Sequence, residues 1–251
     1  MISSSIVQTA TARALASGAL QPIATQTEVI ENFVVRAAST VAAKAAAAPR
    51  PDPLGDYEPD LFVGDVGSRH YVLLNKYPVT ANHLLLVTRE FHDQELPLDA
   101  ADFAALAELM AALGGLGFYN AGRVAGASQA RKHLQLVPLP LAPQVSALVP
   151  LEPLYARGAL PFRHAFAPLG GWDELYVTYR QLLGRWPGAP YNLLVTRGWM
   201  LLVPRRQEHY ETVSVNALGF AGSLYVRNSA ELELVRRAGP MNVLRSVAVP
   251  I

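Results

Sequence analysis

A histidine with polar residues at alternate positions stands out in the run 128–135 (SQARKHLQ). If residues 132–136 form an extended strand, successive side chains point to opposite faces of that strand. Arg131, His133 and Gln135 then share one face, so a cation, an imidazole and an amide lie together. The other face carries Lys132, Leu134 and Leu136.

This combination of groups suits a phosphate. The guanidinium of Arg131 and the backbone N–H groups of the preceding loop can hold an anion. A neutral imidazole, whose ordinary pKa is about 6.5, can attack phosphorus and form a covalent intermediate. The alternative is that His133 is a hydrogen-bonded core histidine at the start of a strand. The motif by itself leaves both interpretations open.

The overall composition limits the classes of protein and partner. The chain has 251 residues, of which 51% are hydrophobic and 16% charged, so we expect a substantial buried core. A net charge of +1 gives no reason to expect a nucleic-acid partner. The absence of cysteine excludes disulfides and thiolate metal sites. Neither a secretory signal nor an apolar run of about 18 residues is visible, so we expect a cytoplasmic protein with no membrane contact.

Hydrophobic periodicity and turn residues predict the main elements. We expect helices over 3–17, 27–47, 99–113 and 172–185. Asp99 can cap the third of these, with Asp102 in its first turn. Two further helices are predicted. The first should follow a cap at Asn228, with Glu231 as its capping-box partner, and the second should begin at Pro240. Paired strands are predicted at 70–76 with 83–89, 191–197 with 198–205, and 213–216 with 220–227. Another strand, 116–120, should lead through loop 121–126 into the histidine motif.

Three polar side chains lie at predicted element ends. Asn75 and Lys76 end a strand, where they could face a ligand or be solvated. Lys44 lies near the end of the second predicted helix, where a cation complements the helix dipole. The histidines outside the motif show no spacing typical of metal ligands, so no metal site is predicted.

A short repeat raises the question of internal duplication. The pentapeptide LLVTR occurs at 85–89 and again at 193–197, an offset of 193 − 85 = 108 residues. We hypothesise that a single domain, 1–251, contains two related α+β halves, 60–140 and 160–227. Only the first half keeps the histidine motif.

An ordered set of short motifs resembles one family. It comprises 60–65 (DLFVGD), 75–77 (NKY), 118–122 (FYNAG), 125–129 (AGASQ), 132–135 (KHLQ), 191–197 (YNLLVTR) and 214–222 (SVNALGFAG). Together these resemble the diadenosine tetraphosphate phosphorylases, or ATP adenylyltransferases. That family is a branch of the histidine-triad and galactose-1-phosphate uridylyltransferase superfamily.

The resemblance implies an α+β fold with a histidine-triad-like antiparallel sheet and flanking helices. It also implies phosphorolysis of diadenosine tetraphosphate to ATP and ADP through an adenylyl-His133 intermediate, with Gln135 contacting the transferred phosphate. The residues implied to contact nucleotide or polyphosphate, together with Arg131, are Lys44, Asn75, Lys76, Asn120, Gly126, Ala127, Ser128, Gln129, Asn216, Ala217, Leu218, Ser223 and Arg227.

Two positions refine this expectation. Hydrolases of the superfamily have histidine where this chain has Gln135, and an amide does not titrate near pH 7, which favours transfer to phosphate over hydrolysis. Family members usually have histidine at the position of Arg131. Arginine could pair with a phosphate, but it cannot serve as a neutral imidazole acceptor.

Several alternatives stay open at this point. The chain could be a related adenylyltransferase or hydrolase that acts on another nucleotide, such as adenylyl sulfate. It could also be a nucleotide-binding sensor that has lost catalysis. We expect no tightly bound cofactor, although Mg²⁺ could arrive with the polyphosphate. The expected partners are small nucleotides and phosphate, and the chain could be a monomer or a homodimer.

Overall fold

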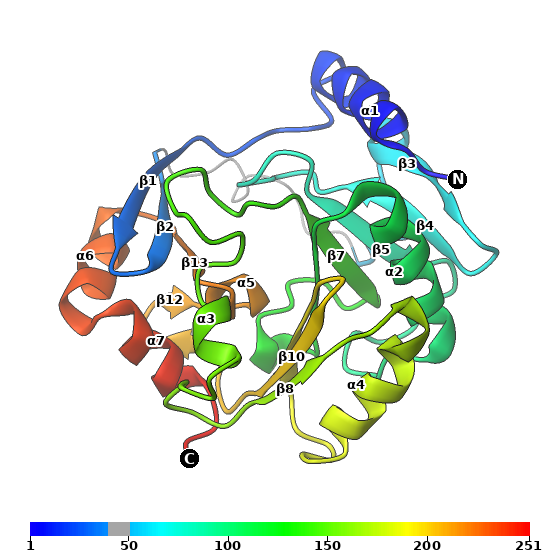
Figure 1. Ribbon diagram of the computed structural model, residues 1–251. Coiled ribbons are helices and arrows are strands. Elements are labelled where there is room, and N and C mark those ends of the chain that lie inside the picture. Colours follow the sequence, from blue (N-terminus) through cyan, green and yellow to red (C-terminus); the bar gives the residue numbers. More distant parts are fainter. Residues whose placement is uncertain (40–50) are drawn as a thin grey trace.

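The strand that carries His133 lies near the middle of a large antiparallel sheet (Figure 1). The computed structural model describes residues 1–39 and 51–251. Each strand of this sheet is antiparallel to its neighbours. The order is β3 (Phe62–Val66), β4 (His70–Leu74), β5 (Leu84–Thr88), β7 (His133–Val137), β6 (Leu116–Asn120), β9 (Tyr191–Val195), β10 (Trp199–Pro204) and β8 (Ala165–Pro168). The predicted α+β class is confirmed.

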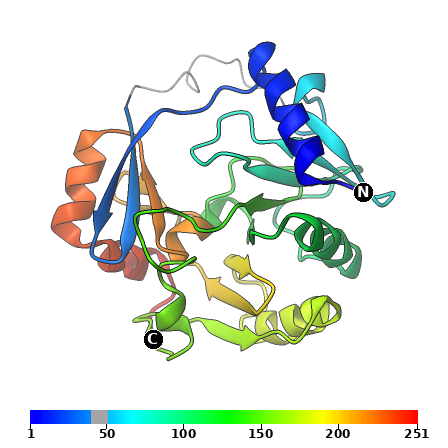
Figure 2. The same cartoon turned by 45° about the horizontal axis from the view of Figure 1, so that its top comes forward.

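Helices cover one face of this sheet (Figure 2). They are α1 (Ser4–Ala16), α2 (Ala100–Leu113) and α4 (Leu175–Leu183). Their apolar side chains pack with the even-numbered residues of β5 and β7, including Leu86, Leu134 and Leu136. As predicted, Lys132 lies on this side, where its Nζ is 3.3 Å from the Asp102 carboxylate.

The opposite face of the sheet carries two separate apolar clusters. One contains Leu85 and Val87 of β5, and the other contains Leu116 and Phe118 of β6 together with much of the C-terminal segment. Strand β7 lies between β5 and β6. Its side chains at 133 and 135 are polar and belong to neither cluster. A polar strip therefore interrupts the core at the histidine.

Most of the local predictions are confirmed. Strands β4 and β5 form the expected hairpin, and β9 pairs with β10. Asp99 caps α2, and Asp102 completes a capping box. Helix α4 follows a short 3-10 turn, η4 (Trp172–Glu174), while α6 (Ser229–Ala238) and α7 (Pro240–Val247) begin where expected. The remaining short elements are η2 (Pro59–Leu61), η3 (Arg123–Ala125) and α3 (Glu152–Tyr155).

The helix predicted over 27–47 is wrong within the described residues. The structure has a hairpin there, β1 (Thr25–Ile30) and β2 (Phe33–Ala38), whose turn places Glu31 at a positive φ of 54°. Apolar residues four apart suggested a helix, but β-branched side chains fit a pleated strand better. The core covers Phe33, Val35 and Ala37, which alternate along β2. Lys44 lies outside the described residues, so its predicted role stays untested.

The predicted pairing of 213–216 with 220–227 is also wrong. Strand β12 (Val213–Ser214) pairs with β11 (His209–Tyr210), and the intervening residues form a short helix, α5 (Ala217–Phe220). Strand β13 (Ser223–Val226) instead lies parallel to β2 and completes a three-stranded sheet with β1. Asn216 caps α5 with its side chain, and this turn chemistry separates the two strands.

The strand order bears on the hypothesis of two halves. The unit β5–α2–β6–β7 lies in the sheet as β5-β7-β6, and the unit β8–α4–β9–β10 lies as β8-β10-β9, so that β6 and β9 are neighbours. Both units therefore share one connectivity. The repeated pentapeptide, however, falls on β5 in the first unit and on β9 in the second, which hold different places. The duplication stays a hypothesis, and the LLVTR match does not align its halves.

Candidate active site

The imidazole of His133 is buried and held in one tautomer. The residue is 4% exposed, and its Nδ1 lies 2.8 Å from the backbone carbonyl oxygen of Arg131. Because a carbonyl only accepts, Nδ1 carries the proton and Nε2 keeps a lone pair. Burial lowers the pKa of His133, opposed by this hydrogen bond. The ring is therefore neutral near pH 7, with Nε2 available as a nucleophile.

A glutamine that sequence reasoning missed fixes the backbone of this histidine. The side chain of Gln94 is 2% exposed and accepts from the His133 backbone N–H at 2.8 Å. Its amide nitrogen donates to the carbonyl of Asn120 at 2.8 Å and to that of His133 at 3.2 Å. Gln94 therefore ties the start of β7 to the end of β6. Nothing in its local sequence indicated this role.

Gln135 belongs to a second hydrogen-bonded chain, with His83 and Asn75. The Oδ1 of Asn75 accepts from the backbone N–H of Tyr77, which identifies Nδ2 as the group 3.1 Å from His83 Nδ1. His83 Nδ1 must then accept, and its Nε2 donates to Gln135 Oε1 at 2.9 Å. Burial lowers the pKa of His83 to about 4, so the ring is neutral.

The hydrogen bonds from Asn75 through His83 to Gln135 determine which end of the Gln135 amide is free. Because Oε1 accepts from His83, only Nε2 remains to meet a ligand, and none of the described residues accepts from it. Nε2 is a donor, and a donor is the group that a phosphoryl oxygen requires. The sequence indicated no role for His83 beyond the absence of metal-ligand spacing, whereas in the structure its ring contacts Gln135 directly.

The glycine-containing loop is pressed against the start of α5. Gly126 has a φ of +88°, and a Cβ added there would lie 2.7 Å from the Val215 carbonyl oxygen and 3.0 Å from the Asn216 Cα. The structure therefore brings two predicted segments together across 90 residues of sequence. Leu218 completes this turn by donating its N–H to the Asn216 side chain at 3.0 Å.

The N–H groups of the loop divide into two sets. Those of Ala125, Gly126 and Ala127 bond to carbonyl groups of the loop itself, so they are not available to an anion, contrary to expectation. The N–H groups of Ser128 and Gln129 have no acceptor in the part of the chain that the structure describes. They are the loop donors that could face a phosphate.

A buried network of polar side chains forms hydrogen bonds to the backbone of the loop and of α5. Asn120 accepts at Oδ1 from the Ala217 N–H at 2.9 Å and from Asn192 at 2.8 Å. Asn192 also donates to the carbonyl of Ala125 at 2.8 Å. Arg205, 2% exposed, donates to Asn192 and, at 2.8 Å, to the carbonyl of Val215. Asn120 therefore joins the loop to α5, with help from two residues that sequence reasoning missed.

Two predicted cations are engaged by carboxylates. The guanidinium of Arg131 pairs with Asp52 and donates to the carbonyl of Thr88 at 2.9 Å. It is not free to hold a phosphate in this arrangement, whereas its carbonyl orients His133. Lys76 pairs with Glu58, which raises the pKa of the lysine.

The last two predicted contacts lie at the three-stranded sheet. The Ser223 hydroxyl accepts from Arg36, which also donates to the Leu141 carbonyl. Arg227 is mostly exposed and binds Glu231 at 2.8 Å. Among residues 1–39 and 51–251, no hydrogen bond or ion pair joins either residue to the histidine cluster; Ser223 contacts Arg36 and Arg227 contacts Glu231.

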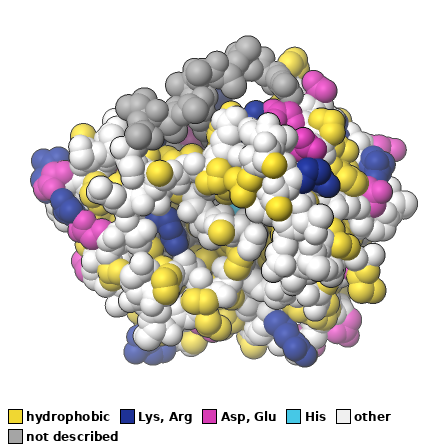
Figure 3. All heavy atoms as spheres, turned by 90° about the horizontal axis from the view of Figure 1, so that it is seen from above, with side chains coloured by type: hydrophobic (Ala, Val, Ile, Leu, Met, Phe, Trp, Pro, Cys, Tyr) yellow, Lys and Arg dark blue, Asp and Glu magenta, His cyan; other side chains and the backbone are white. Residues whose placement is uncertain are grey.

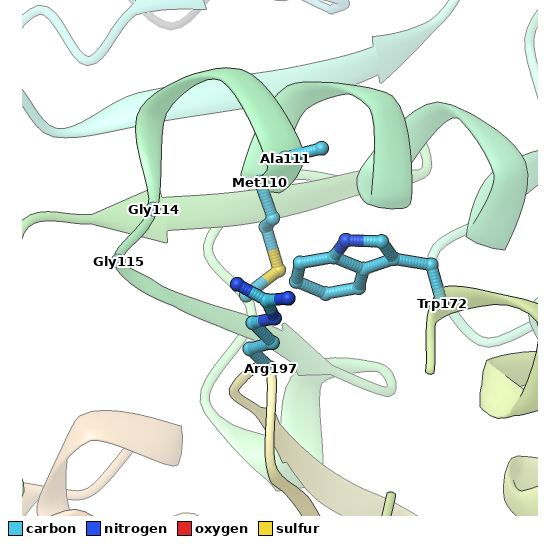
Figure 4. Close-up of a pocket in the computed structure, with 6 residues that line it drawn as sticks. All are labelled: Met110, Ala111, Gly114, Gly115, Trp172 and Arg197. Atoms are coloured by element: carbon cyan, nitrogen blue, oxygen red, sulfur yellow. The ribbon is translucent and has the colours of Figure 1, made fainter. Parts of the chain in front are cut away.

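Surface charges are dispersed, and the open pocket of the structure is not lined by His133 or Gln135. Figure 3 views the molecule from above, where Lys and Arg side chains are scattered singly over the visible face. An open pocket of about 390 Å³ lies elsewhere, at the far end of β7 (Figure 4). Its lining is Met110, Ala111, Gly114, Gly115, Trp172 and Arg197. Across residues 1–39 and 51–251 we find no cluster of three metal-ligating side chains and no helix able to span a membrane.

Comparisons with known proteins cover the whole of this arrangement. The Ap4A phosphorylase N-terminal domain matches residues 2–157, and the ATP adenylyltransferase C-terminal domain matches residues 158–250. Diadenosine 5',5'''-P1,P4-tetraphosphate phosphorylase 2 of Saccharomyces cerevisiae is 28% identical over 236 residues, covering 72% of this chain and 70% of the yeast protein. Protein APA1 of the same yeast is 29% identical, covering 70% of this chain and 69% of its own length.

Solved structures show the same fold. The crystal structure of yeast Ap4A phosphorylase Apa2 in complex with Ap4A superposes with a TM-score of 0.84 and is 23% identical. The complex of Apa2 with AMP gives a TM-score of 0.85, also at 23% identity. Each comparison covers 100% of this chain and 99% of the yeast chain.

Proposed function

The chain belongs to the Ap4A phosphorylase family, and we propose on that basis that it is a nucleotidyltransferase that cleaves diadenosine tetraphosphate with inorganic phosphate. The products are ATP and ADP. The observation that carries the assignment of the nucleophile is the 2.8 Å contact between His133 Nδ1 and the Arg131 carbonyl, which leaves Nε2 unprotonated.

In the first step His133 Nε2 attacks the α-phosphorus of the dinucleotide. A P–N bond forms, the bond from phosphorus to the bridging oxygen breaks, and its electron pair leaves with ATP. The proton on Nδ1 stays in place, and the Arg131 carbonyl stabilises the positive charge that the imidazole acquires. A polyphosphate is a good leaving group, so no acid is needed to protonate it.

In the second step inorganic phosphate attacks the adenylyl group. A new P–O bond forms, the P–N bond breaks, and ADP departs while His133 returns to its neutral state. In both steps the transferred phosphoryl group bears spreading negative charge, which preorganised donors stabilise most effectively. Gln135 Nε2 and the N–H groups of Ser128 and Gln129 are the donors that we assign to it.

The glutamine favours phosphate over water as acceptor. Because Gln135 cannot transfer a proton near pH 7, it offers no general base to activate a water molecule. The anionic acceptor needs no such help. Mg²⁺ bound to the polyphosphate would neutralise further charge, and the described residues supply no dedicated cage for it.

Mass spectrometry tests this assignment directly. After incubation with diadenosine tetraphosphate without phosphate, we expect an AMP-sized addition on the peptide that contains His133. His133→Ala should abolish the addition. His164→Ala is the matched control, because His164 Nδ1 also bonds to a carbonyl two residues earlier, at 2.8 Å, outside the site. An adduct that survives in His133→Ala would refute the assignment.

Product analysis separates the competing functions. Repeated turnover that requires phosphate and yields both ATP and ADP supports phosphorolysis, whereas phosphate-independent turnover with release of AMP indicates a hydrolase. Stronger adenylylation by adenylyl sulfate than by the dinucleotide would identify the alternative substrate. Nucleotide binding without any adduct would favour the sensor.

A further inference from the structure

We propose that Asp52 and Arg131 act as a pair that positions the nucleophile, with the Arg131 side chain fixing the carbonyl that orients His133. The inference rests on the proposed function, because it assigns His133 as the group to be oriented. Asp52 and Arg131 are positioning residues and do not touch the reacting atoms.

The pair lies where regular strand pairing ends. Between β5 and β7 the register runs to the partners Val87 and His133, and one further hydrogen bond joins the Thr88 N–H to the Lys132 carbonyl at 3.1 Å. Beyond this point the Arg131 guanidinium, rather than a backbone N–H group, provides the hydrogen bonds to the end of β5. Its Nη1 donates to the carbonyl oxygens of Thr88, at 2.9 Å, and Arg89, at 3.1 Å. The side chain thus anchors the Arg131 backbone to the end of β5.

Asp52 holds the guanidinium in that position. Arg131 Nε lies 3.1 and 2.9 Å from the two oxygens of Asp52, and Nη2 lies 2.5 Å from one of them. The Arg131 side chain is only 10% exposed, so the pair is partly withdrawn from solvent and two-pronged, which is the geometry of a strong ion pair.

The local turn is shaped around this pair. A Cβ on Gly55 would lie 2.3 Å from the Asp52 carboxylate and 2.6 Å from Arg131 Nη2. A side chain at position 55 would therefore have to displace the carboxylate and the guanidinium from each other's reach. The Gly55 N–H also donates to Asp52 at 3.0 Å, which fixes the carboxylate from its other side.

The backbone of Arg131 is held on its second side as well. Asp93 and Arg131 form an antiparallel bridge, and the Gln94 N–H donates to the Ala130 carbonyl at 2.7 Å. With the guanidinium on one side and this bridge on the other, the Arg131 carbonyl has a fixed direction. Loss of the guanidinium anchor frees one side, so the imidazole loses its preference for a proton on Nδ1.

The decisive variant is Asp52→Asn, which removes the charge and keeps the shape. We expect the single-turnover rate of His133 adenylylation to fall between about tenfold and a hundredfold, as misorientation of a reacting group does, while the half-saturating dinucleotide concentration changes little. Arg131→Lys should lose rate similarly, because one ammonium cannot bridge the carboxylate and both carbonyls. Asp65→Asn is the matched control: it breaks an exposed Arg–Asp pair with Arg89 at the same sheet edge.

A spectroscopic measurement separates positioning from simple stabilisation. In ¹⁵N-histidine-labelled protein at neutral pH, His133 should show a proton on Nδ1 alone in the native chain and in Asp65→Asn. Asp52→Asn should show a mixture of the two tautomers. A lower melting temperature alone would not change the tautomer.

Two outcomes would overturn the proposal. One is adenylylation by Asp52→Asn at the rate of the control. The other is a rate that falls while the His133 tautomer stays unchanged. If the native chain forms no adduct at all, the proposed function fails instead, so the two failures are distinguishable.

Discussion

His83 Nε2 lies 2.9 Å from Gln135 Oε1, and this hydrogen bond engages the oxygen of the Gln135 amide and leaves its nitrogen as the free donor. The two residues are 52 positions apart; His83 directly precedes β5, and Gln135 lies on the neighbouring strand β7. The ring of His83 also lies 5.7 Å from that of Phe118. One neutral imidazole therefore sets the orientation of a predicted catalytic amide.

His83→Phe should slow adenylyl transfer. The phenyl ring keeps the packing against Phe118 but loses both hydrogen bonds, so the Gln135 amide can rotate. A neutral hydrogen bond contributes about 0.5–1.5 kcal/mol, so we expect single-turnover rates to fall about twofold to tenfold. His209→Phe, at an exposed site, is the control. Equal rates in the two variants would show that the amide needs no such support.

Gln135→Glu should almost abolish transfer. The carboxylate has nearly the same shape, but it cannot donate when ionised, and it places a negative charge beside the phosphoryl group. We expect a fall of at least about a hundredfold in the adenylylation rate, comparable with removal of an oxyanion donor. The adduct assay measures it, with binding of uncharged adenosine as the control. Retention of rate at pH 8 would exclude Gln135 as a donor to the phosphate.

The adenylylation rate should fall on the acid side with a midpoint below about 6.5, the ordinary histidine pKa. Burial lowers the pKa of His133, so the nucleophile stays neutral to a lower pH than a free imidazole. As pH falls through that lowered pKa, Nε2 takes a proton and attack stops. A pH profile of single-turnover rates, recorded with the protein folded throughout, checks this. A midpoint above 7 would contradict it.

Acid stability should depend on His83. Its folded pKa is about 4, below the 6.5 of the unfolded chain, so the unfolded state binds the proton first. The contribution of this neutral ring is fully present above pH 6.5 and is lost as pH falls toward 4. Urea unfolding of His83→Phe should therefore show a shallower decline in unfolding free energy between pH 7 and 4 than the native chain. Parallel declines would refute the shift.

Gly126→Ala should impair nucleotide binding more than Gly158→Ala. Both glycines have positive φ, +88° and +62°, so both substitutions incur backbone strain of about 1 kcal/mol or more. Only at Gly126 would the new Cβ also meet backbone atoms of Val215 and Asn216, whereas at Gly158 nothing lies within 4 Å. We expect a raised half-saturating concentration of dinucleotide for Gly126→Ala alone. Calorimetric binding constants for both variants decide.

The local sequence was sufficient to predict those features that depend on residues close together along the chain. Strand alternation placed His133 and Gln135 on one face, away from Lys132, because successive side chains of a strand point to opposite faces. The capping residues of α2 were equally readable, since Asp99 and Asp102 act within one turn. The ordered motifs pointed to the family that the comparisons then showed.

Only the tertiary structure determined which residues orient the side chains of the candidate site. Asp52, His83 and Gln94 contact the segment 131–135 from 79, 52 and 39 positions away, and the fold of the whole chain fixes which of them face it. The hairpin β1–β2 was misread as a helix because apolar spacing is ambiguous until a partner strand is known. Hydrogen bonds between distant residues leave no local pattern, because each depends on where the whole sheet places its partner.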